Sequence, residues 1–331
     1  MGRQRMRKIS CLNKAAVLFL IFFASGCGIV KERVYRKTFM SAGTFVKITS
    51  SYKTASGIAE KEFSRLEKVF NIYDKKSEIS KVNLKAGVEP VKVSRDLIGL
   101  LELSKQLYTF TDGAFDPSIG RVILFWKKLM KDKTINSLPK KEKIEKLMKF
   151  RGMDNIVIDK DASTVFIKKK GIILDLGGIA KGYMVDKAVQ ALKRNKINSA
   201  LINAGGDIFC LGKFEGRDWK IGIRNPESLS VILKVIDAGN SAVATSGDYE
   251  QFFKYKGLVY SHIINPKTGY PVSNPVRSVT VSAPDAVTAD GMATALFILG
   301  KDKIPDFLYR KHPNLKVFVV QGSGLEIRNK Q

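Results

Sequence analysis

Cysteine and histidine are scarce in this chain, and each scarcity excludes a class of site. Three cysteines among 331 residues cannot form the dense disulfide framework of a small secreted module, so stability must come from a buried core. Only two histidines are present, His262 and His312, which excludes a histidine-rich metal centre of the zinc-enzyme type. With 44% hydrophobic residues, the chain is long enough to build a sizeable core.

The apolar run near the N-terminus is too short to cross a bilayer as a helix. It covers residues 15–23, follows a basic segment and ends in small residues before Cys27, an organisation typical of a bacterial lipoprotein signal. An ordinary cleavable signal with an incidental cysteine is the alternative. We expect residues 1–26 to be a signal peptide, Cys27 to be lipidated, residues 27–36 to form a tether, and the protein to lie on the extracytoplasmic, periplasmic side of a bacterial membrane.

The three cysteines offer no disulfide. Cys11 lies in the predicted signal and Cys27 is expected to carry lipid, so Cys210 is left without a partner. Because Cys210 lies in the apolar stretch 208–211, we expect it to be a buried packing residue rather than a reactive thiol.

Basic residues outnumber acidic ones by a wide margin. The chain has 57 lysines and arginines against 31 aspartates and glutamates, a formal charge of +26. Nucleic-acid binding is the first interpretation of such an excess, but the lysines are spread over predicted helical surfaces without aromatic residues between them, and we expect no nucleic-acid partner. A solvated basic face, attraction to anionic lipid headgroups and steering of an anionic substrate stay open as alternatives.

Apolar residues recur at helical spacing in the first half of the chain. Positions from Ala59 to Tyr73 repeat at intervals of four and three, which predicts an amphipathic helix. A second helix is predicted to begin near Ser94, a residue type that caps helix N-termini, and a third near Ser137 with Pro139 in its first turn.

Short apolar segments of strand type dominate the second half. A strand pair over 37–49 precedes the helices, and further strands are predicted over 155–159, 164–168, 172–174, 200–203, 219–223, 231–236, 278–282 and 317–320, with helices over 185–192 and 287–299. This order predicts an α+β fold with mainly antiparallel sheet rather than a doubly wound parallel sheet. We expect one domain over 37–331, helix-rich over about 53–152 and sheet-rich over about 153–331.

Two glycine-rich segments are candidates for ligand contact. Residues 175–183, Asp-Leu-Gly-Gly-Ile-Ala-Lys-Gly-Tyr, lie between a predicted strand and helix, where backbone N–H groups can approach a phosphate. Residues 203–207, Asn-Ala-Gly-Gly-Asp, end a predicted strand. Each segment alone is equally compatible with a structural turn.

Asp290 and Thr294 are candidate metal ligands. Both lie on a predicted helix at positions i and i+4, so their oxygens share a face. Carboxylate and hydroxyl oxygens suit Mg2+ rather than Zn2+, and small residues around the pair leave room for another backbone. A solvated face is the structural alternative. His262, at a predicted strand end, is a candidate acid or base, or a hydrogen-bonded structural residue.

Together these segments resemble the FAD:protein FMN transferase family, known as the ApbE family. The resemblance runs in order over nearly the whole predicted domain and rests on eight segments, namely residues 40–44, 73–80, 113–120, 175–183, 203–207, 244–248, 262–271 and 289–300.

The resemblance implies a T-fold-like layered architecture with FAD held in a cleft. It implies that Asp290, Thr294 and the backbone carbonyl of Ala180 bind Mg2+, and that His262 is the catalytic proton-transfer residue. Lys181 is interpreted either as a phosphate ligand or as a solvent-facing side chain. The residues that it implies for the FAD site are Met40, Tyr73, Ala114, Phe115, Asp116, Gly177, Tyr183 and Ile264.

The activity that the resemblance implies is Mg2+-dependent transfer of FMN from FAD to a threonine of an acceptor protein, with release of AMP. The expected partners are extracytoplasmic flavoprotein subunits of electron-transport complexes, and the membrane through the N-terminal lipid. Two alternatives stay open: an Mg2+-dependent FAD pyrophosphatase that releases FMN and AMP, and a non-catalytic lipoprotein that carries FAD.

Overall fold

The computed structural model describes residues 33–131, 137–249, 252–255, 258–273, 275–301, 315–322 and 324–328. The predicted signal peptide, Cys27, most of the tether and His312 lie outside the described residues. The chain divides into two compact units, Met1–Lys31 and Glu32–Gln331, and every described residue belongs to the second. Its first strand begins at Tyr35, two residues before the predicted start of the domain.

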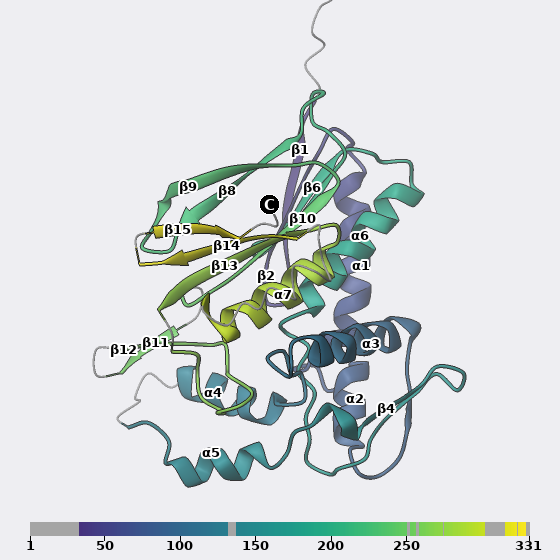
Figure 1. Cartoon of the computed structure of the whole chain (residues 1–331). Coiled ribbons are helices and arrows are strands. Elements are labelled where there is room, and N and C mark those ends of the chain that lie inside the picture. Colours follow the sequence, from purple (N-terminus) through teal and green to yellow (C-terminus); the bar gives the residue numbers. More distant parts are fainter. Residues whose placement is uncertain are drawn as a thin grey trace, which may run out of the picture. The chain divides into compact units, whose positions relative to one another are not determined.

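One antiparallel sheet forms the centre of the domain (Figure 1). Its eight strands are arranged in the order β1-β2-β6-β7-β10-β13-β14-β15, and every neighbouring pair is antiparallel. The strands are β1 (Tyr35–Ser41), β2 (Thr44–Ser50), β6 (Ala200–Ala204), β7 (Asp207–Leu211), β10 (Ser241–Gly247), β13 (Val276–Ala283), β14 (Lys316–Gln321) and β15 (Gly324–Arg328). The predicted α+β class with mainly antiparallel sheet is confirmed, whereas the T-fold-like comparison stays a prediction.

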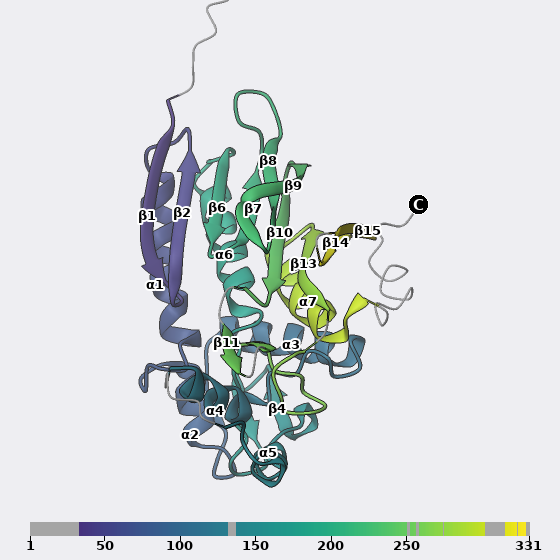
Figure 2. The same ribbon diagram turned by 90° about the vertical axis from the view of Figure 1, so that its left-hand side faces the viewer.

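Three helices cover one face of this sheet: α1 (Ala55–Phe70), α6 (Ala180–Arg194) and α7 (Ala286–Leu299). Figure 2 shows them beside the strands, with α6 running along the strand direction. Alternate strand residues such as Ile202 and Ala244 are buried against these helices in the main core, as expected for a sheet that is half covered by helices.

The opposite face is partly covered by a long hairpin. It is formed by β8 (Trp219–Asn225) and β9 (Ser228–Ala238), and it packs Trp219 against Val243 and Cys210 of the sheet. Cys210 is fully buried and forms no disulfide, so its predicted packing role is confirmed. Burial raises the pKa of its thiol to about 12, which leaves it unreactive near neutral pH.

Short elements complete the domain below the sheet. The helices there are α2 (Glu78–Leu84), α3 (Arg95–Phe110), α4 (Gly120–Lys131), α5 (Lys141–Met148) and the 3-10 turn η1 (Met153–Asn155). The strands are β3 (Val91–Lys92), β4 (Ile156–Asp159), β5 (Thr164–Ile167), β11 (Phe252–Tyr255) and β12 (Leu258–Ser261). The predicted cap of α3 is confirmed, because the Ser94 hydroxyl accepts a hydrogen bond from the Leu97 N–H. Among the described residues, no helix is long and apolar enough to span a membrane.

Two predicted helix boundaries are wrong. The first helix ends at Phe70, before Tyr73, because the Asn71 side chain accepts the Tyr73 N–H in a tight turn that competes with the helix. The helix predicted from Ser137 begins at Lys141, so Pro139 precedes its first turn. Helix α4 was not predicted at all.

The predicted strand over 172–174 is also wrong. Ile172 and Leu174 are fully buried as expected, but Ile173 forms only an isolated parallel bridge with Ile119. The Asn83 side chain takes the place of a neighbouring strand, since its amide accepts the Leu174 N–H at 2.8 Å and donates to the Leu174 carbonyl at 2.9 Å.

Candidate active site

The glycine-rich loop 175–179 leads directly into helix α6, which begins at Ala180. The Asp175 N–H donates to the Pro117 carbonyl at 2.9 Å, and the Asp175 carboxylate accepts the Gly177 N–H at 2.8 Å. The Ala180 N–H then donates to the Leu176 carbonyl at 2.8 Å, which closes the turn into the helix. Hydrogen bonds to the neighbouring segment at Pro117 and within the loop itself therefore fix its conformation.

Gly182 lets α6 and α7 approach each other closely. A Cβ on Gly182 would lie 2.2 Å from the carbonyl oxygen of Ala286, so only glycine fits here. The Gly182 N–H donates to the Asp290 carboxylate at 3.0 Å. The Asp186 carboxylate accepts the first N–H groups of α7, from Ala286 and Val287, at 2.8 Å each, and burial raises the pKa of Asp186 to about 7. These bonds fix α7 on α6.

Asp290 and Thr294 face the glycine loop from α7. Asp290 is only 4% exposed. The Thr294 hydroxyl lies 3.5 Å from the Gly178 carbonyl oxygen and 3.3 Å from the Ser246 hydroxyl. The Thr294 hydroxyl thus lies near the Gly178 carbonyl, while the Asp290 carboxylate, one helical turn earlier on α7, accepts the Gly182 N–H of α6.

Lys181 lies between Asp290 and the second glycine-rich segment, residues 203–207. Its ammonium pairs with the Asp207 carboxylate and lies 3.8 Å from the nearer Asp290 oxygen. Asp207 is only 2% exposed and follows a turn in which Gly205 and Gly206 both have positive φ, 63° and 102°. Lys181 therefore lies between two carboxylates instead of pointing freely to solvent, and the turn at 203–207 serves to place Asp207.

The turn between β1 and β2 abuts the same region. The Gly205 N–H donates to the Phe45 carbonyl at 3.2 Å, and a Cβ on Gly205 would lie 2.4 Å from the Thr44 hydroxyl. Segments 40–44 and 203–207 of the family resemblance are therefore adjacent in space. Met40, next to this turn, is 60% exposed.

Lys127 is a site residue that the sequence did not reveal. Its ammonium lies 3.2 Å from the Asp175 carboxylate and 5.7 Å from the ring centre of Tyr73, which is itself exposed. Burial acts to lower the pKa of Lys127, but Asp175 and Tyr73 outweigh it and raise the pKa above its usual value. Lys127 lies on the unpredicted helix α4, whose buried Val122 and Trp126 were the available signal.

The segment 114–116 lies behind the loop. The Phe115 ring approaches within 3.4 Å of the position that a Cβ on Gly178 would occupy. The Asp116 carboxylate accepts both the N–H and the hydroxyl of Ser118, at 2.9 and 2.6 Å, while burial raises the pKa of Asp116 above its usual value. Ala114 is buried beside them.

The other predicted residues lie on surrounding elements. The Tyr183 hydroxyl donates to the Asp96 carboxylate at 3.0 Å, and its ring packs edge-on against Phe70. Ile264 is buried in the cluster that contains Trp126, and His262 is half-buried directly after β12. The structure thus gathers Phe115, Gly177, Ala180, Asp290 and Thr294 around one loop. Lys181, interpreted above either as a phosphate ligand or as a solvent-facing side chain, lies there with Asp207 of the candidate segment 203–207. Lys127, which the sequence did not reveal, joins them.

Two of the hollows in the described part of the chain are lined by none of the predicted FAD residues. One of about 1000 Å3 is lined mainly by residues of α3, β4 and α7. Its lining includes Ile179, the last residue of the loop, and Met292, two residues after Asp290. The other, of about 750 Å3, lies at the far end of α6. The predicted FAD cleft therefore stays a prediction.

The oxygens around Asp290 fit Mg2+ better than a transition metal. Within the described ranges, no group of three or more histidine, cysteine, aspartate or glutamate side chains could hold an ion. Mg2+ is commonly held by one or two carboxylates, with waters and substrate phosphate oxygens completing its octahedron. Asp290, Thr294 and nearby carbonyls match that pattern, and Lys181 beside Asp290 favours an anionic ligand.

Comparison with known proteins identifies the family. The ApbE family model matches residues 42–319. The chain belongs to the ApbE family. A curated relative from Treponema pallidum, named FAD:protein FMN transferase, is 32% identical over 324 residues and covers 89% of this chain and 88% of its own. The relative of the same name from Haemophilus influenzae is 34% identical over 254 residues, 75% of this chain and 72% of its own.

Solved ApbE structures share the fold. The ApbE protein from Thermotoga maritima has a TM-score of 0.80 at 34% identity and covers 90% of this chain and 97% of its own. The flavin transferase ApbE from Vibrio cholerae has a TM-score of 0.77 at 26% identity, with 89% and 96% covered.

Lys127→Met is expected to raise the KM for FAD by roughly tenfold with a smaller effect on kcat. The reason is that a charge-assisted hydrogen bond to Asp175 is worth about 1.5–3 kcal/mol, and its loss frees both Tyr73 and the loop of this ApbE protein. Steady-state kinetics with FAD would measure the change. Lys128→Met, the exposed neighbour on α4, is the matched control; an equal rise in KM in both variants would contradict the assignment.

Proposed function

We propose that this chain is an FAD:protein FMN transferase that moves the FMN moiety of FAD onto a threonine side chain of an acceptor flavoprotein. The product is a phosphodiester, and AMP is released. The observation that carries this proposal is the position of Asp290 and Thr294 one turn apart on α7, with Thr294 near the Gly178 carbonyl and Asp290 near Lys181. Curated relatives of the chain have this name.

The chemistry is a displacement at the FMN-side phosphorus. The threonine oxygen forms a bond to that phosphorus, the bond to the bridging oxygen breaks, and AMP leaves with that oxygen. His262 takes the proton of the attacking hydroxyl. Because little covalent chemistry is required of the protein, rate depends on positioning and charge.

The residues around the loop supply the charge. Asp290, Thr294 and the Ala180 carbonyl would hold Mg2+, which when bound neutralises the pyrophosphate against an approaching nucleophile. Lys181 adds a second positive charge, and the N-terminus of α6 adds the partial positive charge of its helix dipole. Tyr73, with Lys127 behind it, and Phe115 would bind the flavin nucleotide on the loop side.

The proposed location is the extracytoplasmic side of a bacterial membrane, with a lipid on Cys27. A common membrane surface raises the effective concentration of enzyme and membrane-bound acceptor. The acceptors proposed are extracytoplasmic flavoprotein subunits of electron-transport complexes. An acceptor threonine distinguishes this activity from FAD hydrolysis to FMN and AMP, which the same site would perform with water.

The test is FMN transfer by residues 28–331, which contain the whole described core from Val46 to Val319. The protein is incubated with FAD, Mg2+ and an acceptor domain that contains a candidate threonine, and both in-gel flavin fluorescence and AMP are measured. We expect a fluorescent acceptor and equimolar AMP, both lost with EDTA and restored by Mg2+.

Two controls separate the alternatives. An acceptor with its threonine replaced by alanine should stay dark. AMP together with free FMN, across a panel of acceptors, would favour the pyrophosphatase, and FAD binding without AMP at any Mg2+ concentration would leave only the carrier.

A further inference from the structure

The central sheet has two chemically different ends. Asp207, which pairs with Lys181, begins β7 at one end. At the other end Tyr35 pairs with Ser50, Ser50 with Ala200, and Ala200 with Leu211. Helix α6 begins beside Asp290 and ends at Arg194, close to this second end. Its 15 residues span about 22 Å, so the second end lies well away from the site.

Exposed cations gather at the second end. Within the described part of the chain, none of these cations forms an ion pair with a carboxylate. Two acidic residues, Glu215 and Asp218, also lie at this end, in the loop between β7 and β8. We call this surface the basic end; its cationic residues are Arg33, Arg36, Lys53, Lys193, Arg194, Lys196, Lys213 and Arg217.

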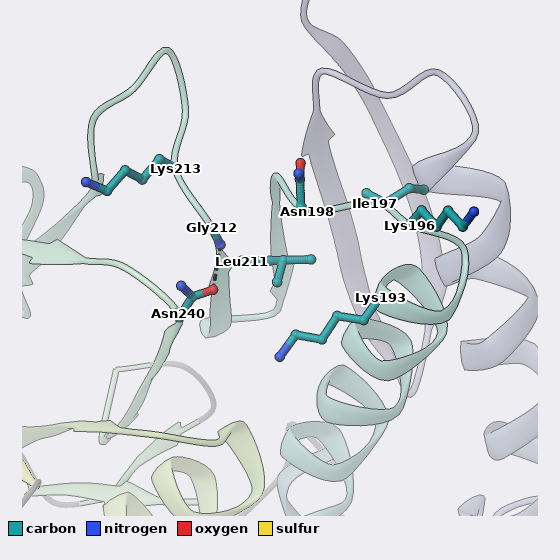
Figure 3. Close-up of a pocket in the computed structure, with 8 residues that line it drawn as sticks. All are labelled: Lys193, Lys196, Ile197, Asn198, Leu211, Gly212, Lys213 and Asn240. Atoms are coloured by element: carbon teal, nitrogen blue, oxygen red, sulfur yellow. Dashed lines mark hydrogen bonds between the residues drawn. The ribbon is translucent and has the colours of Figure 1, made fainter.

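The hollow of about 750 Å3 lies within the basic end (Figure 3). Lys193, Lys196 and Lys213 stand around it, and Figure 3 shows their ammonium groups pointing apart rather than toward one point. Asn240 is occupied in holding the loop, because its side-chain oxygen accepts the Gly212 N–H at 2.8 Å. Diverging charges fit an extended layer of anions better than a single phosphate.

The path of the chain adds a second argument. Arg33, the first described residue, lies next to Tyr35 at the basic end. Cys27, the lipidation residue proposed above, is six residues earlier, a distance of at most about 20 Å whatever the conformation. A lipid on Cys27 therefore brings the basic end, and not the site, toward the bilayer.

We propose that the basic end docks on anionic phospholipid headgroups and orients the domain with its active site facing away from the membrane. Each lysine or arginine near an anionic leaflet contributes about 1 kcal/mol of attraction. This orientation rests on the lipid anchor proposed above, but the headgroup contact is a property of the folded domain alone. Headgroup binding also gives a role to part of the chain's excess of basic over acidic residues.

The experiment measures binding of residues 28–331, without lipid, to vesicles. The vesicles are phosphatidylcholine alone or a mixture with about one-third phosphatidylglycerol, and co-sedimentation gives the partition coefficient. We expect binding to the anionic vesicles only, weakened by added salt because of screening. K193Q/K196Q/K213Q should bind roughly 100-fold more weakly, at about fivefold for each lysine.

The matched control carries the same charge change elsewhere. K140Q/K146Q/K149Q alters exposed lysines at and beside α5 and should keep vesicle binding. FMN transfer to a soluble acceptor should be unchanged in K193Q/K196Q/K213Q, so failure of this inference is distinct from failure of the proposed function. Equal loss of binding in both triple variants would show that net charge alone is responsible, and absence of binding by the unaltered domain would overturn the proposal outright.

Discussion

Asp290→Asn is expected to lower FMN transfer by at least about 1000-fold while leaving the fold intact. Its carboxylate is buried one helical turn before Thr294 on α7 and accepts the Gly182 N–H, so an amide there removes the charge on which the proposed Mg2+ binding depends. Asparagine keeps the size of the side chain and an oxygen that can accept the Gly182 N–H. Lys181 retains Asp207 as its partner.

A second readout ties this loss to the metal. Ligand binding stabilises a folded protein by about 2.7 kcal/mol at 100 times its Kd, so Mg2+ and FAD together should raise the Tm of the unaltered protein and not that of Asp290→Asn. Asp237→Asn is the matched control, because Asp237 is exposed and pairs only with Lys220 in the described structure. A metal-dependent Tm shift that survives in Asp290→Asn would show that the metal lies elsewhere.

Gly182→Ala is expected to destabilise the protein by about 2–3 kcal/mol, the usual effect of overpacking a close contact. The added Cβ would lie 2.2 Å from the Ala286 carbonyl oxygen and 2.9 Å from the Asp290 Cβ. Helix α7 must then move away from α6 and carry Asp290 with it. We therefore expect a Tm lower by roughly 5 °C and slower FMN transfer in the same variant.

Gly57→Ala is the matched control for Gly182→Ala, because Gly57 has space for a Cβ. A Cβ on Gly57 of α1 would have no atom within 4 Å, and alanine is the better helix former by about 1 kcal/mol. Gly57→Ala should therefore raise the Tm slightly. A neutral effect of Gly182→Ala on both Tm and transfer would mean that the α6–α7 contact is adaptable and that it does not position Asp290.

Local patterns in the sequence determined much of the fold. The alternation in 37–49 and the apolar segments after residue 200 predict strands that the structure contains, in the central sheet and in the β8–β9 hairpin. Ser94 caps a helix because its hydroxyl acts within four residues of itself. The i, i+4 spacing of Asp290 and Thr294 places both on one helix face, since helical geometry is local. Where a local side-chain bond competed, as at Asn71, the predicted helix boundary was wrong.

Only the tertiary structure decided which distant groups meet. The pairing of Lys181 with Asp207, the approach of Gly182 to Ala286, and the contacts of Lys127 join segments far apart in the chain. Periodicity reports which face of an element is buried but not which other element covers it. The gathering of lysines at the end of the sheet opposite the site follows from the antiparallel register and the length of α6. Register and packing are long-range properties, and no local pattern encodes them.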